Sequence, residues 1–156
     1  MVSEGDSVPK FTVNDANGNK IKSSDFKGKK HVIYFYPKDF TPGCTTEADE
    51  FSKDYKKFQK EEIEIIGVSP DNVESHKKFC DKMGIKYPLL ADVDKEISNS
   101  FGVWGKKKFM GREYMGVMRS TFLVNEKGKI FKIYPKVKPA GHSKEVLEDF
   151  LNLKLK

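Results

Sequence analysis

Residues 31–36 read HVIYFY, and this stretch decides the fold that we expect of the chain. A run of β-branched and aromatic side chains without a charge is typical of a strand buried on both faces of a sheet. After a short polar loop, residues 45–60 carry apolar side chains at steps of three and four, at Ala48, Phe51, Tyr55 and Phe58. This spacing predicts a helix that packs one face against the strand.

The alternation of strands and helices continues on both sides of this unit. The predicted elements are a small hairpin around Asn17-Gly18, strands at 63–68 and 89–92, helices at about 71–83 and 95–101, strands at 121–125 and 129–134, and a helix from about Ser143. This order predicts an α/β sandwich in which helices flank a mixed central sheet, which is compatible with a thioredoxin-like fold.

The length and composition limit the class of protein. The chain has 156 residues, 37% of them hydrophobic, and its 12 phenylalanines require a core, so we expect one domain over residues 1–156. The longest apolar run, residues 32–36, is far too short to span a membrane, and the first residues lack a secretory signal. We therefore expect a cytoplasmic protein with no membrane contact.

The net charge of +6 raises the question of nucleic acid, because most of the positive excess lies in residues 79–156. The lysines do not cluster with aromatic side chains, so a solvated surface is expected and nucleic-acid binding is the weakest alternative. The two cysteines are too few for a disulfide scaffold. They are inert core residues, metal ligands or redox-active groups.

Residues 37–47, PKDFTPGCTTE, connect the first buried strand to the amphipathic helix. Thr41 suits the N-cap and Pro42 the first helical position, which places Cys44 in the first turn. The unpaired amide groups and the helix dipole favour an anion there, and such a position is known to favour a thiolate. A small cysteine that only packs would fit the same features, so the residues alone leave both interpretations open.

Three segments resemble the peroxiredoxins. The pattern P-x-x-x-T-x-x-C occurs at 37–44, and TPGCTTEA at 41–48 is similar to the bacterioferritin comigratory protein branch, also called the Q type. The segments GVSPD at 67–71 and RSTFL at 119–123 resemble further parts of that family, and about residues 3–152 are covered in the expected order. The resemblance implies a thioredoxin-like, antioxidant peroxidase that reduces hydrogen peroxide and organic hydroperoxides.

The resemblance also implies a role for each site residue. Cys44 would attack the peroxide and become a sulfenic acid, while the Thr41 hydroxyl and the amide groups of Gly43 and Cys44 hold the peroxide oxygens. Arg119 would supply positive charge that favours the thiolate, and Pro37 would shield the sulfur from water. We expect a supporting role for Glu47, either paired with Arg119 or complementing the helix dipole.

The chain departs from the family at the second cysteine. Many members carry one five residues after the first, where this chain has Asp49, and the other thiol here is Cys80. A subset of the family uses a cysteine in this arrangement to resolve the sulfenic acid as an intramolecular disulfide. This role is expected for Cys80, with a one-cysteine peroxidase as the alternative. By resemblance, a thioredoxin-like protein is the reductant, no cofactor is used, and the chain is a monomer or weak homodimer.

Other sites are weaker candidates. His76 and Cys80 are four residues apart, as two metal ligands can be, but His31 and His142 are isolated, so we predict a solvent-facing His76 and no metal. The methionines between residues 110 and 118 suit a pocket for apolar peroxides or, more commonly, gap filling in the core. A non-catalytic thiol sensor, holdase or binding module of the same fold is the alternative from another class.

Overall fold

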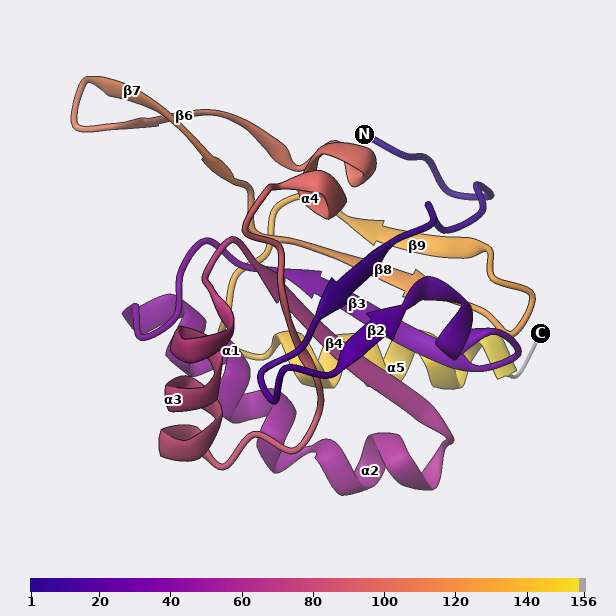
Figure 1. Cartoon of the computed structure of the whole chain (residues 1–156). Helices are drawn as coiled ribbons and strands as arrows, with labels where there is room; N and C mark the ends of the chain where they lie inside the picture. The colour runs from indigo at the N-terminus through magenta and orange to yellow at the C-terminus, as the bar shows by residue number, and fades with distance from the viewer. Residues whose placement is uncertain (155–156) are drawn as a thin grey trace.

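A computed structural model describes residues 1–154 of the chain (Figure 1). The elements in chain order are β1 (Thr12–Asn14), β2 (Lys20–Lys22), the 3-10 helix η1 (Ser23–Phe26), β3 (Lys30–Phe35), α1 (Pro42–Lys53), α2 (Tyr55–Lys60), β4 (Ile63–Ser69), α3 (Val73–Met83), β5 (Leu89–Ala91), α4 (Glu96–Phe101), β6 (Trp104–Phe109), β7 (Arg112–Val117), β8 (Ser120–Val124), β9 (Ile130–Tyr134) and α5 (His142–Lys154). Helices flank the central strands, as predicted.

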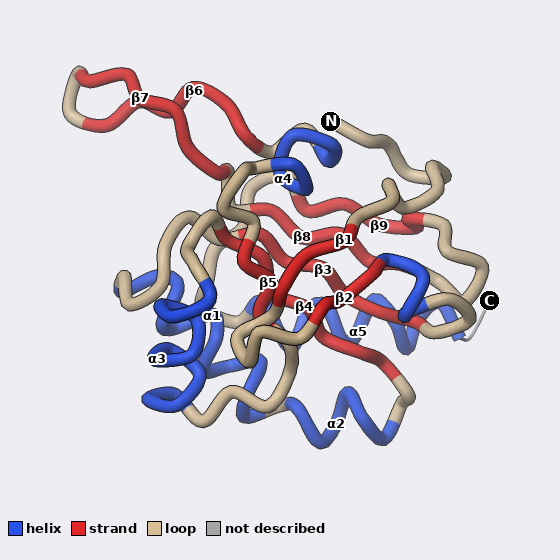
Figure 2. Tube along the Cα trace, in the orientation of Figure 1, coloured by secondary structure: helices blue, strands red, loops and turns tan. Residues whose placement is uncertain are grey.

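The central sheet has five strands in the order β5-β4-β3-β8-β9. Strands β3, β4 and β5 run parallel, whereas β8 is antiparallel to β3 and β9 is antiparallel to β8. The sheet is therefore mixed, as predicted from the order of elements. Two small antiparallel hairpins, β1–β2 and β6–β7, lie outside it (Figure 2).

The segment at residues 31–36 divides the core into two layers, because its side chains alternate between the faces of the sheet. Val32, Tyr34 and Tyr36 join a cluster formed with α1, α2, α3 and α5. Ile33 and Phe35 join the opposite cluster, which includes η1, α4 and the β1–β2 hairpin. Both faces of β3 are thus covered, as the uncharged run predicts.

Two of the predicted helices differ from the structure. The helix predicted over residues 45–60 is two helices, because α1 ends at Lys53 and α2 begins at Tyr55. Helix α3 begins at Val73, later than predicted, because the Asn72 side chain accepts from the Ser75 amide and caps the helix at that point.

The β6–β7 hairpin was not predicted. It projects from the body of the molecule (Figure 1), and Met110 at its tip is 89% exposed, while Met115 is 50% exposed. Neither methionine fills a gap in the core. Three consecutive lysines interrupt β6, so its residues WGKKKF lack the regular alternation of a strand, and most of the hairpin's side chains are not buried.

The longest helix within residues 1–154 is α5, with 13 residues. No helix of this part of the chain combines the length and the apolar character that a bilayer crossing requires.

Candidate active site

Cys44 lies in the first turn of α1. Thr41 is the N-cap with extended backbone angles and Pro42 is the first helical residue, as predicted. The Thr45 amide is bonded to the Thr41 carbonyl at 2.8 Å, so the amide groups of Gly43 and Cys44 precede the first intrahelical donor. The Thr41 hydroxyl donates to the Lys38 carbonyl at 2.8 Å instead of capping the helix, which leaves the lone pairs of its oxygen available to a ligand.

Arg119 directly precedes β8, the strand that pairs with β3 on the edge opposite β4. Strand β8 pairs Ser120 with Phe35, so Arg119 emerges beside the loop that follows β3. One guanidinium nitrogen, Nη2, donates to the Cys44 sulfur at 3.3 Å. The cysteine is only 1% exposed, so little water screens the sulfur from this positive charge.

The same guanidinium also binds Glu47. Its Nη1 donates to Glu47 Oε1 at 2.9 Å, which is the expected pairing, and the Glu47 side chain is fully buried. Burial raises the pKa of Glu47 to about 7, although the neighbouring Arg119 opposes the rise. Its second oxygen, Oε2, has no hydrogen-bond partner within residues 1–154. Glu47 therefore holds Arg119 against the sulfur at a cost in desolvation.

The raised pKa of Glu47 predicts that stability falls between pH 5 and 8. The folded state keeps a proton on Glu47 that the unfolded chain loses near pH 4.5, so the contribution is complete below that value and is lost as pH rises through about 7. The free energy of unfolding of wild type should therefore fall by about 2–3 kcal/mol between pH 5 and 8, and Glu47→Gln should lack this fall.

Urea denaturation at pH 5, 6, 7 and 8 measures this difference between wild type and Glu47→Gln. Glu64→Gln, at an exposed position on β4, is the matched control and should follow wild type. A parallel pH dependence in Glu47→Gln and wild type would contradict the assignment.

Gly43 is required by the close approach of Arg119. A Cβ atom at Gly43 would lie 2.9 Å from Arg119 Nη2 and 3.4 Å from Pro139 Cγ. Pro139 thus borders the site, and sequence reasoning missed it because it lies almost a hundred residues from the motif. Pro37, the remaining predicted residue, is half-buried in the loop directly after β3.

Cys80 lies on α3, partly buried, and packs against the same core cluster that contains Cys44. Both cysteines are free thiols in this structure. Burial raises the pKa of Cys80 to about 11, with smaller contributions from Asp39 and Asp81. Where it lies, Cys80 is therefore a protonated thiol and a weak nucleophile.

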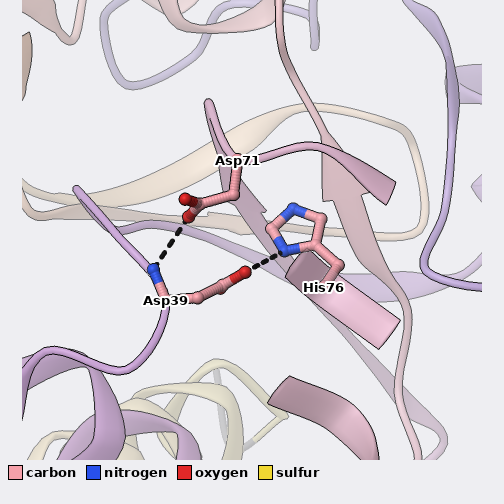
Figure 3. A group of neighbouring side chains, drawn as sticks. All are labelled: Asp39, Asp71 and His76. Carbon is pink, nitrogen blue, oxygen red and sulfur yellow. Dashed lines mark hydrogen bonds and ion pairs between the residues drawn. The ribbon is translucent and has the colours of Figure 1, made fainter. Parts of the chain in front are cut away.

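The predicted solvent-facing His76 is wrong. The ring is completely buried, with Nδ1 2.8 Å from Asp39 Oδ2 and Nε2 2.9 Å from the Leu90 carbonyl. Asp39, Asp71 and His76 bring ligand atoms within 4.8 Å of one another, the spacing that one metal ion needs (Figure 3). These atoms already hydrogen-bond to protein groups, so the arrangement is satisfied without an ion.

The signal that could have revealed this burial is the helical spacing. His76 shares a face of α3 with Phe79 and Cys80, three and four residues later, and that face turns toward the core.

Together, these groups suit the reduction of a small oxygen compound by a thiolate. The sulfur lies at a helix N-terminus with two amide donors beside it, and the guanidinium provides fixed positive charge. Such donors can stabilise the charge that develops on a departing oxygen.

Comparison with known proteins gives consistent results. Residues 4–133 match the AhpC/TSA family. The chain is 44% identical over 144 residues to Peroxiredoxin Bcp of Bacillus subtilis, with 92% of both chains covered. A cysteine-to-serine mutant of Xylella fastidiosa PrxQ has a TM-score of 0.93 and 32% identity, and covers 100% of this chain and 99% of its own. A similar mutant of Xanthomonas campestris Peroxiredoxin Q has a TM-score of 0.87 and 38% identity, with 91% and 90% covered. The predicted thioredoxin-like fold is confirmed.

Proposed function

This chain belongs to the AhpC/TSA family, and from that membership we propose that it reduces hydroperoxides through Cys44. Its relatives of known structure and high coverage are peroxiredoxins, and the chain is a thiol-dependent peroxidase of this kind. The observation that carries the assignment of Cys44 is the single guanidinium of Arg119, which binds both the Cys44 sulfur and the buried Glu47.

The first step is attack of the Cys44 thiolate on one oxygen of the peroxide. A sulfur–oxygen bond forms, the oxygen–oxygen bond breaks, and the other oxygen leaves as hydroxide or alkoxide and takes a proton. Cys44 becomes a sulfenic acid. Arg119 and the amide groups of Gly43 and Cys44 stabilise the negative charge, and the Thr41 oxygen accepts from the peroxide O–H. Pro37 limits the access of water.

The second step is resolution by Cys80. Its sulfur attacks the sulfur of the Cys44 sulfenic acid, the sulfur–oxygen bond breaks, and the hydroxyl leaves as water with the Cys80 proton. The product is an intramolecular disulfide, which a thioredoxin-like dithiol protein then reduces. We place this cycle in a single cytoplasmic domain over residues 1–156 that acts as a monomer or weak homodimer.

A one-cysteine cycle is the second candidate. It is favoured by the burial of Cys80, whose pKa of about 11 keeps it protonated in this structure. In that cycle an external thiol attacks the Cys44 sulfenic acid, and Cys80 has only a packing role.

Intact mass distinguishes the candidates. After one equivalent of hydrogen peroxide, wild type should lose two hydrogens, and Cys80→Ser should carry one added oxygen at Cys44. Added oxygen in wild type without a disulfide would instead support the one-cysteine cycle. Cys44 unchanged in both proteins would contradict the peroxidase assignment.

A further inference from the structure

A buried hydrogen bond between Asp39 and His76 connects the active-site loop to the helix that carries Cys80. Asp39 lies between β3 and α1, five residues before Cys44, and His76 lies one turn before Cys80 on α3. Their side chains are 1% and 0% exposed, and His76 Nδ1 lies 2.8 Å from Asp39 Oδ2 (Figure 3). The pair joins two segments that are separated by 37 residues.

Every polar atom of the pair has a partner. The Tyr36 hydroxyl donates to Asp39 Oδ1 at 2.6 Å, and the Ser75 hydroxyl donates to Oδ2 at 2.8 Å. His76 Nε2 lies 2.9 Å from the Leu90 carbonyl, which can only accept. Both ring nitrogens therefore lie within hydrogen-bond distance of an oxygen atom, so the buried ring is held at both ends.

Further contacts hold the same two segments together. The Asp39 amide donates to Asp71 Oδ2 at 2.8 Å, just before α3. The ring of Phe40 lies edge-on to that of Phe79, with 5.1 Å between the ring centroids. Phe40 has a positive φ of 67°, an unfavourable conformation for a bulky residue that persists only where its surroundings impose it. The loop is thus held against α3 under backbone strain.

We propose that the buried Asp39–His76 hydrogen bond is a latch that must open before Cys44 and Cys80 can form their disulfide. This inference rests on the proposed resolution by Cys80. Cys44 follows the latched loop within one turn of α1, and its sulfur is bound to Arg119 in the closed state. Both cysteines are free thiols, and the Cys44 sulfur has to leave its contact with Arg119 before it can take up the geometry of a disulfide with Cys80.

Opening would also activate Cys80. Burial is the largest cause of its raised pKa, so exposure to water lowers that pKa and increases the thiolate fraction. The latch therefore sets the time for which the Cys44 sulfenic acid persists. During that time a second peroxide can oxidise it to sulfinic acid. The strength of the Asp39–His76 pair decides between disulfide formation and over-oxidation.

Two substitutions weaken the latch. Asp39→Asn replaces the carboxylate by an amide of the same size, and His76→Asn removes the imidazole ring that binds Asp39. Quenched-flow oxidation with one equivalent of hydrogen peroxide, followed by alkylation and intact mass, gives the rate constant for conversion of sulfenic acid to disulfide. We expect both variants to convert about tenfold faster or more, since a charge-assisted hydrogen bond no longer opposes opening.

The second readout is the hydrogen peroxide concentration that leaves half of Cys44 as sulfinic acid during turnover with dithiothreitol. In the latch variants this peroxide concentration should rise by a factor similar to the increase in the rate of disulfide formation. If the latch variants fail to fold, Ser75→Ala, which removes one hydrogen bond to Asp39, should still give an increase of about two- to threefold.

His142→Asn is the matched control. His142 is also completely buried and bonded through both ring nitrogens, but to Glu145 and to Thr121 on β8. In this variant the rate constant for conversion of sulfenic acid to disulfide should lie within about twofold of the wild-type value. Equal acceleration in this control, or disulfide formation at the wild-type rate in the latch variants, would overturn the latch alone. Wild type that forms no disulfide would overturn both the latch and the proposed role of Cys80.

Discussion

Replacing Arg119 by methionine should slow oxidation of Cys44 by about 10²–10³, the usual loss when one preorganised donor is removed from a developing oxyanion. The substitution removes the 3.3 Å contact from Nη2 to the Cys44 sulfur and leaves Glu47 buried without its cation. Both the thiolate and the departing oxygen lose their positive charge. The second-order rate constant with hydrogen peroxide, measured by quenched flow and intact mass, gives the size of the loss.

Arg112→Met provides the matched control, because Arg112 is the other arginine of the chain and lies exposed on β7. It should react at the wild-type rate. A similar loss in both variants would attribute the effect to overall charge rather than to contact with Cys44. Thermal unfolding of Arg119→Met establishes that the protein is folded under the assay conditions.

Replacing Phe51 by alanine should lower the free energy of unfolding by about 3–5 kcal/mol. Phe51 is fully buried on α1, and its ring stacks on Tyr34 at 4.8 Å and contacts the rings of Phe58, Tyr87 and His142. The substitution leaves a cavity between the catalytic helix and the sheet. Because a domain is usually stable by only about 5–15 kcal/mol, this is a large fraction of the total. Urea denaturation measures the loss.

The same substitution at Phe109 is the control for Phe51. Phe109 lies on the β6–β7 hairpin and is 66% exposed, so its removal should change stability by about 0.5 kcal/mol or less. A loss at Phe51 no larger than the loss at Phe109 would show that the cavity between α1 and β3 collapses without cost.

The residues around Cys44 could be predicted because their signals are local. The N-cap and the proline at the start of α1 depend on the backbone of a few neighbouring residues. The uncharged run at residues 31–36 likewise indicates burial on both faces of β3. The link between Arg119 and Cys44 spans 75 residues, and the motif resemblance supplied it rather than the local pattern.

Other features were missed because their cause lies far away in the chain. The burial of His76 is favourable because Asp39, 37 residues earlier, and the Leu90 carbonyl bind its ring nitrogens, so a polar residue on a helix was taken for a surface one. The β6–β7 hairpin lacks a buried face, and its strands are defined by their mutual pairing alone.

The sequence by itself therefore determined the order of strands and helices, the mixed sheet and the position of Cys44 at a helix start, since periodicity and capping act over short distances. Only the tertiary structure gave the geometry by which one guanidinium of Arg119 binds both Cys44 and Glu47, the approach of Pro139 to Gly43, and the buried Asp39–His76 hydrogen bond. These contacts depend on strand register and on which charges meet in the interior, where water no longer screens them.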